Sequence, residues 1–338
     1  MDNAIRYGVV GCAGMGTNHA DAIEEIDGAT LVACADVDEG IARSFAETYD
    51  TAWYTDPAEM ARDAELDAAS VCTPNGTHLE IVTALAEAGV DVLCEKPLEI
   101  TPERTNELVD VCERADVTAG CIFQRRTCGG PRLAREALAD GRLGELVLGE
   151  VQVKWYREPS YYDDVGWHGT ADVDGGILHT QALHGIDLLQ WATGGIERVA
   201  AKSEARHHDI EVPDTVVVSV EFADGGYGQI TGSTAVYPQE PITLRVHGTE
   251  GSIAWYEDEL ESFETIDGDD ATAEPFHLGT GIPAQVRDFV EAIEENREPM
   301  VPLPEARKTN DVVFAIEAAI EREEWVDVAA VRDERSGP

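Results

Sequence analysis

The first 123 residues alternate between short apolar segments and stretches with helical spacing, and this alternation constrains the fold more than any other feature. Apolar segments that suit buried strands lie at 4–10, 29–36, 68–73, 90–94 and 117–123. Helical spacing fills the gaps between them, at 18–26, 39–49, 78–88 and 101–114. Because this pattern is typical of parallel sheets covered on both faces, we predict an α/β fold with a doubly wound parallel sheet over residues 1–122.

The pattern changes after Phe123. Helical spacing at 130–140 precedes a long strand-like run at 146–155 and an apolar helix at 178–192. Runs rich in Val, Ile and Thr follow at 198–204, 215–222, 227–234, 243–247 and 252–255, and two helices follow at 283–295 and 304–321. We therefore expect a second α/β domain over residues 123–338, built on a large, mostly antiparallel open sheet.

The charge balance excludes some classes of partner. The chain has 67 acidic and 24 basic residues, a net charge of −43, and only four of the basic residues are lysines. No basic stripe is present to neutralise phosphates, which argues against nucleic-acid binding. The acidity is spread along the chain, which predicts a halophilic protein, since concentrated salt screens such self-repulsion.

The lack of a targeting signal and the distribution of the cysteines predict a cytoplasmic protein. No apolar run is long enough to span a membrane, and the N-terminus lacks the pattern of a secretory signal. The seven cysteines all lie in the first 128 residues without CxxC spacing. We interpret them as small buried side chains in a reducing compartment, and no metal site is indicated.

A glycine-rich turn follows the first apolar segment. Gly11, Ala13 and Gly16 occupy the three places of the dinucleotide fingerprint, where glycines allow a tight turn, approach of a pyrophosphate and close helix packing. Ala13 departs from the usual glycine, and Gly14 next to it can supply the flexibility. The helix predicted after this turn, over 18–26, would offer its N-terminus to the phosphates.

Asp36 bears on the choice of cofactor. It ends the second strand-like segment, 20 residues after Gly16, where an acid accepts hydrogen bonds from the adenosine ribose. A carboxylate there repels the 2′-phosphate of NADP, and residues 37–39 contain no arginine to bind it. We therefore expect NAD, with NADP as the alternative.

Lys96 comes directly after the apolar segment 90–94, in the sequence Glu95-Lys96-Pro97. Ligands of parallel sheets bind beyond the carboxyl ends of the strands. An ammonium group there can bind a substrate oxygen and stabilise the charge that develops on it. The alternative is an ordinary surface lysine in a loop.

Several motifs together resemble the Gfo/Idh/MocA family, which includes glucose–fructose oxidoreductase, inositol dehydrogenase and the rhizopine catabolism protein. The resemblance rests on the glycine turn with His19, the segment Cys72-Thr73-Pro74-Asn75 with His78, the segment Val92 to Pro97, and the run from Trp167 to Asp187. It implies a Rossmann domain followed by an α/β domain whose open sheet serves oligomerisation, so a homodimer or homotetramer is expected.

The resemblance also implies roles for single residues. Lys96 matches the catalytic lysine, Pro97 is expected after a cis peptide bond, and His184 matches a histidine that completes the active site with an acid four residues earlier. The loop beside the nicotinamide matches Thr73 to His78. The implied cofactor-binding set is Gly11, Ala13, Gly14, Met15, Gly16, Asp36, Thr73, Pro74, Asn75, His78, Glu95 and Lys96.

Thr180 is a departure from the family pattern, because many members carry an aspartate there. Four residues is about one helical turn, so Thr180 and His184 are expected to share a helix face. A threonine can form hydrogen bonds but cannot take a proton at neutral pH. Family members that oxidise nucleotide-activated sugars often lack this aspartate, which leaves Lys96, His184 and Thr180 as the catalytic candidates.

Two mechanisms follow from this set. In the first, His184 accepts the hydroxyl proton and Lys96 holds the oxygen; an imidazole has a reference pKa of about 6.5, which suits a base near neutrality. In the second, a neutral Lys96 is the base. Both mechanisms require Lys96 and His184 to act at the same carbon.

Other polar side chains have weaker indications. The family contacts its substrate near Arg125, Arg126, Tyr161, Tyr162, Trp167, His168 and Gln181. Aromatic faces and polar donors suit sugar rings, and we select Arg125, Tyr162, Trp167, His168 and Gln181. His179 lacks metal-ligand spacing, Asp187 is expected to orient other groups, and His207 and His208 are expected in a solvated loop.

The sequence thus predicts an oxidoreductase that moves a hydride between NAD(P) and a secondary hydroxyl or ketone of a sugar, cyclitol or nucleotide sugar. Two alternatives remain open at this stage. One is an NAD-dependent glycosidase that acts by transient oxidation and elimination and forms no net NADH. The other is a non-catalytic NAD-binding regulator, because fold alone does not determine function.

Overall fold

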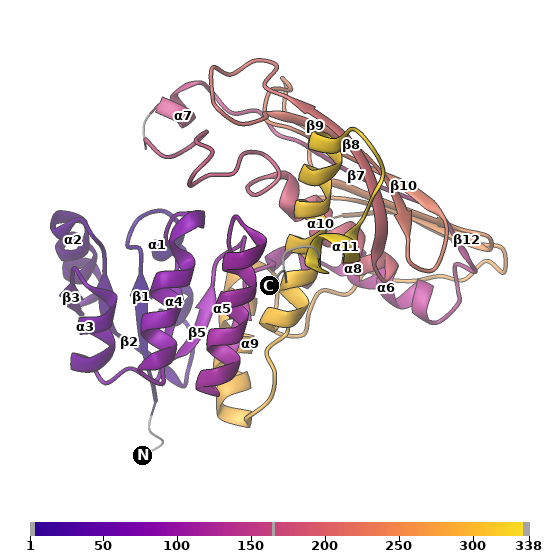
Figure 1. Cartoon of the computed structure of the whole chain (residues 1–338). Helices are drawn as coiled ribbons and strands as arrows, with labels where there is room; N and C mark the ends of the chain where they lie inside the picture. The colour runs from indigo at the N-terminus through magenta and orange to yellow at the C-terminus, as the bar shows by residue number, and fades with distance from the viewer. Residues whose placement is uncertain (1–3, 164–165, 258, 334–338) are drawn as a thin grey trace. The chain divides into compact units, whose positions relative to one another are not determined.

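The computed structural model describes residues 4–163, 166–257 and 259–333. Residues 1–3, which belong to the N-terminus examined for a secretory signal, lie outside these ranges. The chain folds into two compact units, Met1–Gln124 with Leu278–Arg307, and Arg125–His277 with Lys308–Pro338 (Figure 1). We call them the first unit and the second unit.

The first unit is built on a six-stranded sheet in the order β3-β2-β1-β4-β5-β6. All of its strand pairs are parallel, which confirms the predicted sheet. The strands are β1 (Ile5–Val10), β2 (Ala29–Ala35), β3 (Ala52–Tyr54), β4 (Ala68–Val71), β5 (Asp91–Cys94) and β6 (Ala119–Cys121). The strand order reverses between β1 and β4, where open α/β sheets bind their ligands.

Helices cover both faces of this sheet. They are α1 (Met15–Glu24), α2 (Glu39–Tyr49), α3 (Pro57–Asp63), α4 (His78–Glu87), α5 (Pro102–Ala115) and α9 (Gly281–Glu295). Helices α3, α4 and α5 pack side by side, and α1 packs against α9 (Figure 1). Thr101 caps α5 by accepting a hydrogen bond from the Arg104 amide, and Pro102 occupies its first turn.

The return of residues 278–307 to the first unit corrects the expected boundary, which ran without interruption from 123 to 338. Helix α9 carries an apolar face whose Val286, Phe289 and Val290 are buried in the same core as Tyr7 and Ile23. The Phe289 ring meets the Tyr7 ring edge-on, with centroids 6.5 Å apart. Burial of this face against α1 explains why a distant segment completes the first unit.

The second unit contains an eight-stranded sheet in the order β13-β12-β11-β7-β10-β9-β8-β14. Among the strands of the described residues, only β7 and β10 pair in parallel, so the predicted mostly antiparallel sheet is confirmed. The strands are β7 (Leu146–Lys154), β8 (Ile196–Glu204), β9 (Thr215–Phe222), β10 (Tyr227–Ser233), β11 (Thr243–Gly248), β12 (Gly251–Tyr256), β13 (Glu259–Thr265) and β14 (Val326–Asp327).

One face of this sheet packs against helices. Helix α8 (Ala182–Thr193) lies against β7, β10 and β11, and α6 (Gly129–Ala139) lies against β11, β12 and β13. Along β9 the side chains alternate, so that Val216 and Val218 are buried while Val217 is 52% exposed. The unit also contains α7 (Ser160–Asp163) and α11 (Val328–Asp333), and α10 (Leu303–Arg322) passes from one unit to the other.

The sequence prediction omitted β3, α3, α7, β13, β14 and α11. All six are seven residues or fewer, and β3 lies at the sheet edge with Trp53 38% exposed, so the apolar signal was weak. All seven cysteines are free, and six are buried, as expected for small apolar side chains. Among the described residues no helix is long and apolar enough to cross a membrane.

Candidate functional site

The glycine turn between β1 and α1 leaves no room for side chains at two positions. Gly11 has φ +89°, and a Cβ added there would lie 2.6 Å from the Cys72 carbonyl oxygen. A Cβ added at Gly16 would lie 1.9 Å from the Gly11 carbonyl oxygen. Both glycines are therefore required by the close packing of the turn, as the fingerprint predicts.

The outer side of the same turn is open. Ala13 and Gly14 are exposed, and a Cβ added at Gly14 would meet nothing within 4 Å. Helix α1 has no side-chain cap and no acidic residue in its first turn, which leaves its N-terminal amides available to an anion. This combination of a tight inner side and an uncapped helix fits the pyrophosphate of a dinucleotide.

Asp36 lies directly after β2 and is fixed by two main-chain amides. Its Oδ2 accepts a hydrogen bond from the Cys12 amide at 2.9 Å, and its Oδ1 accepts one from the Asp38 amide at 3.0 Å. The carboxylate is thereby held next to the glycine turn. This is the place where the sequence predicted an acceptor for the adenosine ribose.

Lys96 follows β5 at the carboxyl edge of the sheet, and the Lys96–Pro97 peptide bond is cis, as expected. A buried chain of hydrogen bonds leads to it. The Tyr7 hydroxyl lies 3.0 Å from Ser70 Oγ, which lies 2.8 Å from His19 Nδ1. His19 Nε2 lies 3.2 Å from Glu95 Oε1, and Glu95 Oε2 accepts from the Lys96 amide at 3.2 Å.

Glu95 is charged within this chain of contacts. Burial raises the pKa of Glu95, but the hydrogen bond from His19 and the charges of His19 and Lys96 outweigh it, so the pKa lies below the usual range. Both carboxylate oxygens face protein groups, and the residue is 5% exposed. Glu95 thereby fixes the main chain of Lys96, and its expected contact with the cofactor stays a prediction.

His78 connects the two loops that flank this edge of the sheet. Its Nδ1 lies 2.9 Å from the Pro97 carbonyl oxygen, and its Nε2 lies 3.0 Å from the Thr73 carbonyl oxygen. The ring is fully buried. His78 was expected beside the cofactor, but its contacts make it a link between the loop at Thr73 and the Lys96 turn.

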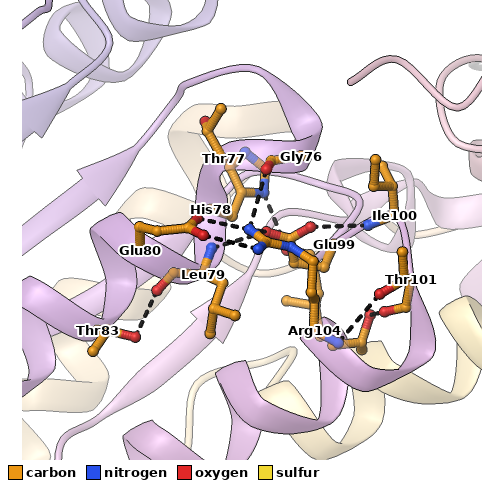
Figure 2. A network of polar contacts seen from close by, with 12 residues as sticks. Gly76, Thr77, His78, Leu79, Glu80, Thr83, Glu99, Ile100, Thr101 and Arg104 are labelled. Atoms are coloured by element: carbon orange, nitrogen blue, oxygen red, sulfur yellow. Dashed lines mark hydrogen bonds and ion pairs between the residues drawn. The ribbon is translucent and has the colours of Figure 1, made fainter. Parts of the chain in front are cut away.

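A second link surrounds Arg104, at the start of α5 (Figure 2). Its guanidinium donates to Glu80 at 2.6 Å, to buried Glu99 at 2.8 Å and to the Gly76 carbonyl oxygen at 3.1 Å. Glu99 also accepts from the Leu79 amide at 3.0 Å. Residues 75–80 and the segment after Lys96 are therefore held together by one buried carboxylate and one arginine.

The loop from Thr73 to Thr77 is compact in itself. The Thr77 hydroxyl lies 2.9 Å from Thr73 Oγ1 and donates to the Pro74 carbonyl oxygen at 2.7 Å. Asn75 is 7% exposed, whereas Thr73 and Pro74 are partly exposed. Of the four residues predicted to line the nicotinamide, Thr73, Pro74, Asn75 and His78, only the first two are thus accessible.

In the second unit, helix α8 begins at Ala182, later than predicted. Thr180 lies before the helix, so the expected common helix face with His184 is wrong. The Thr180 hydroxyl is 2.8 Å from the Gly176 carbonyl oxygen and 2.5 Å from Gln181 Oε1. His184 is 8% exposed in the first turn of α8, with its ring 5.9 Å from the Trp155 ring.

Aromatic side chains from the loop after β7 gather near this helix. The Tyr161 ring stacks on the His168 ring, with centroids 4.2 Å apart and planes at 10°, and Trp167 contacts His168 at 4.1 Å. Gln181 donates to the Tyr161 hydroxyl at 3.3 Å. We call Trp155, Tyr161, Trp167, His168, Gln181 and His184 the aromatic cluster.

Arg125, Arg126 and Tyr162, which lie where the family contacts its substrate, have polar partners within the second unit. Arg125 pairs with Glu257 at 2.7 Å, and Arg126 is buried against Asp187 at 2.6 Å. The Tyr162 hydroxyl lies 2.8 Å from Thr234 Oγ1, and burial raises the pKa of Tyr162 to about 12. These side chains stabilise the fold around the cluster.

His208 was expected in a solvated loop, and this expectation is wrong. It is 8% exposed, with Nδ1 3.1 Å from Asp214 Oδ2 and Nε2 donating to the Arg157 carbonyl oxygen at 2.9 Å. Burial raises the pKa of Asp214, but amide hydrogen bonds from residues 206–208 outweigh this and lower it to about 2. The sequence around His208 is polar throughout, so the burial of Asp214 was not predictable from it.

Sequence reasoning also missed Ser70, Arg104 and Arg157, which surround the candidate residues. His19 belongs to the glycine-turn motif, but its contacts with Ser70 and Glu95 were not predicted. Ser70 is a polar residue within an apolar strand. Because buried polar groups form hydrogen bonds, it was the one residue whose position indicated a buried contact.

Comparison with known proteins identifies the family of the chain. Residues 5–123 match the oxidoreductase family with an NAD-binding Rossmann fold, and residues 132–254 match the GFO/IDH/MocA C-terminal domain. The chain belongs to the Gfo/Idh/MocA family. Its first domain is an NAD-binding Rossmann domain.

Similar proteins include two dehydrogenases of cyclitols. The chain is 28% identical to inositol 2-dehydrogenase of Rhizobium meliloti over 312 residues, which cover 87% of this chain and 90% of that protein. It is 31% identical to myo-inositol 2-dehydrogenase of Thermotoga maritima over 257 residues, which cover 74% of each.

Among solved structures, the WlbA dehydrogenase of Bordetella pertussis in complex with NADH and UDP-GlcNAcA superposes with a TM-score of 0.89. It is 26% identical, and the match covers 96% of this chain and 99% of that one. Proteins that resemble the chain thus include two inositol dehydrogenases and a dehydrogenase crystallised with NADH and UDP-GlcNAcA.

Proposed function

We propose that this protein is an NAD-dependent dehydrogenase that removes a hydride from a secondary hydroxyl of a sugar, a cyclitol or a nucleotide sugar. The observation that carries the proposal is the position of Lys96. It follows β5 at the carboxyl edge of an NAD-binding sheet, and buried Glu95 fixes its main chain. A cation held at this edge suits the stabilisation of an alkoxide-like oxygen.

In the proposed site, residues of the glycine turn hold the cofactor. Main-chain groups of Gly11 to Gly16, including Ala13, Gly14 and Met15, would bind the pyrophosphate, and Asp36 would accept hydrogen bonds from the ribose. Thr73, Pro74 and Asn75 would border the nicotinamide. Bound NAD supplies the hydride acceptor of the reaction.

The protein's own side chains would then handle the proton and the oxygen. Lys96 orients the substrate hydroxyl and stabilises its developing negative charge, and His184 accepts its proton. Thr180, whose hydroxyl contacts Gly176 and Gln181, acts as a positioning residue because it cannot carry a proton at neutral pH.

The aromatic cluster is the proposed substrate side. The faces of Trp155, Tyr161, Trp167 and His168 suit the apolar faces of a sugar ring, and Gln181 can exchange hydrogen bonds with its hydroxyls. Inositol dehydrogenases and the UDP-GlcNAcA-bound WlbA dehydrogenase among the similar proteins support substrates of this class.

A substrate panel tests the proposal. Purified protein is incubated at high salt with NAD or NADP and a set of sugars, sugar acids, inositols and UDP-sugars, and nicotinamide absorbance is followed. We expect NADH formation with at least one compound, and faster with NAD than with NADP. Substrate cleavage without net NADH would favour the glycosidase mechanism, and NAD binding without turnover of any compound would favour a regulator.

We also propose that copies of the chain associate through the exposed face of the eight-stranded sheet, as a homodimer or homotetramer. Val217 is 52% exposed and Tyr227 is 63% exposed on neighbouring strands of this sheet. Val217→Glu should then lower the mass measured by light scattering to that of a monomer. The same mass for the wild-type protein and the variant would contradict this interface.

We further infer a halophilic protein from its net charge of −43, and a cytoplasmic one from its seven free cysteines. Salt of about 1 M shortens the Debye length to about 3 Å, which weakens repulsion between carboxylates. The melting temperature should rise steadily as NaCl is increased. A melting temperature that stays the same between low and molar salt would contradict this adaptation.

A further inference from the structure

Arg157 lies just after β7 and is held firmly by its main chain. Its amide donates to the Thr234 carbonyl oxygen at 2.8 Å, and its carbonyl oxygen accepts from His208 Nε2 at 2.9 Å. His208 is itself bonded to the buried carboxylate of Asp214. The backbone from which the Arg157 side chain extends is therefore fixed by the core of the second unit.

The guanidinium group of Arg157 lies among aromatic rings. Its central carbon is 5.8 Å from the Trp155 ring centroid and 5.2 Å from the Tyr161 ring centroid. The same Trp155 ring is 5.9 Å from the His184 ring. Arg157 thus lies beside the aromatic cluster, and one ring separates it from the proposed base.

The hydrogen bonds of this guanidinium are incomplete. Nη1 donates to the Tyr156 carbonyl oxygen at a long 3.4 Å, and the Tyr161 hydroxyl is a further partner. The Nε–H is buried and has no hydrogen-bond partner among the described residues. A buried donor on a charged group is costly to leave unpaired, so such donors commonly face a ligand.

The lack of an acidic partner is notable in this chain, which has 67 acidic and 24 basic residues. Three other arginines of the second unit are paired: Arg125 with Glu257, Arg126 with Asp187, and Arg206 with Glu204. Arg157 forms no ion pair within the part of the chain that the structure describes. Its positive charge therefore remains available in the aromatic cluster.

We propose that Arg157 binds an oxyanion of the substrate, so that the substrate class narrows to sugars or cyclitols bearing a carboxylate or a phosphate. This inference rests on the proposed dehydrogenase function. A guanidinium presents Nε–H and one Nη–H along the same edge, which matches two oxygens of either group. A cation at this point also offsets the repulsion that the acidic chain exerts on an anionic substrate.

The experiment compares substrates that differ only in their anionic group. The kcat/KM values of glucose and glucuronate test the carboxylate, and those of glucose and glucose 1-phosphate test the phosphate, with UDP-glucose and UDP-glucuronate as a third pair. We expect the wild-type protein to prefer the anionic member of at least one pair. In Arg157→Met, kcat/KM for that member should fall about 100-fold, with less than a twofold change for the neutral one.

Two further variants test whether the effect is specific to Arg157 and to its paired donors. Arg206→Met removes an exposed guanidinium that pairs with Glu204, and it should leave every substrate unaffected. Arg157→Lys keeps the charge but not the paired donors, and it should recover part of the loss. If Arg157→Met does not fold, Arg157→Lys and Arg157→Gln provide the same comparison.

An equal loss for neutral and anionic substrates would overturn the proposal and assign Arg157 a structural role. A wild-type protein that favours the neutral member of every pair would overturn it as well. If no compound reduces NAD, the dehydrogenase function fails, and calorimetric titration of NADH-loaded protein with glucuronate and glucose 1-phosphate still decides the role of Arg157. Binding that disappears in Arg157→Met supports the anion site, and equal binding by both proteins contradicts it.

Discussion

Lys96 in the first unit and His184 in the second unit are held in place by different kinds of contact. Around Lys96, the first unit relies on main-chain geometry and buried charge: Gly16 cannot accept a side chain, and Glu95 and Glu99 are enclosed with their partners. Around His184, the second unit relies on ring contacts from an irregular segment between β7 and α8. The region around Lys96 is therefore fixed by backbone packing and buried charge, whereas the region around His184 is shaped by contacts between a few aromatic side chains.

The largest effect should follow from a substitution that breaks the main-chain geometry. In Gly16→Ala, the new Cβ would lie 1.9 Å from the Gly11 carbonyl oxygen, so the turn must deform. We expect the affinity for NADH, measured by fluorescence titration, to fall by about 100-fold or more, equivalent to about 2.7 kcal/mol.

Gly89→Ala is the matched control. Gly89 also has a positive φ, of +77°, but an added Cβ meets nothing within 4 Å. It should lower the free energy of unfolding by about 1 kcal/mol through backbone strain and leave NADH affinity unchanged. Equal affinities for all three proteins would show that close packing of the turn is not required.

Glu95→Gln tests the buried charge on the same side. Removing one partner of a buried ion pair should lower the free energy of unfolding by about 3 kcal/mol. Because Glu95 also fixes the Lys96 amide, kcat/KM should fall about 10- to 100-fold, through kcat more than KM. Glu107→Gln, an exposed partner of Arg114, should change neither quantity measurably.

The pH dependence of this effect has a definite sign. The pKa of Glu95 is lower in the folded protein than in the unfolded chain, so the unfolded chain binds the proton first. The stabilisation is complete above the ordinary glutamate pKa of about 4.3 and is lost as the pH falls through the folded value. Urea unfolding at several pH values should therefore show a smaller acid loss in Glu95→Gln; identical pH curves would contradict the role of this carboxylate.

Asp214→Asn makes the corresponding change in the second unit. Asp214 accepts three amide hydrogen bonds and its pKa is about 2, so the substitution should cost about 1–3 kcal/mol at neutral pH. The wild-type protein should lose this stabilisation between about pH 4 and pH 2, since the unfolded chain binds the proton at about pH 3.9. NADH affinity should not change, and exposed Asp209→Asn in the same loop serves as the control.

Thr180→Val should have the smallest effect. It removes a hydroxyl that contacts Gly176 and Gln181, at a cost of about 1 kcal/mol in the free energy of unfolding. If Thr180 only positions its neighbours, kcat should fall less than tenfold and the pH–rate profile should keep its shape. Loss of a titration from that profile would assign Thr180 a part in proton transfer.

The same contrast explains how far the sequence predicts the structure. The parallel sheet, the tight glycine turn and the place of Asp36 directly after β2 were confirmed, because each follows from local spacing or a tight backbone requirement. The cis bond before Pro97, which the family resemblance implied, is also present, whereas the contact of Asp36 with a ribose stays a prediction. The return of α9 to the first unit depends on which core its apolar face enters, and local spacing carries no such information. The roles of His208 and Arg157 depend on contacts between distant segments and were not predictable.

The most direct test of the account is the fate of the hydrogen on the reacting carbon. The best substrate of the panel, deuterated at its carbinol carbons, is turned over with NAD, and the NADH formed is analysed by mass spectrometry. The account predicts one deuterium in the nicotinamide ring of the NADH, and almost none formed by Lys96→Met. NADH without deuterium, or deuterated NADH formed by Lys96→Met at the wild-type rate, would contradict it.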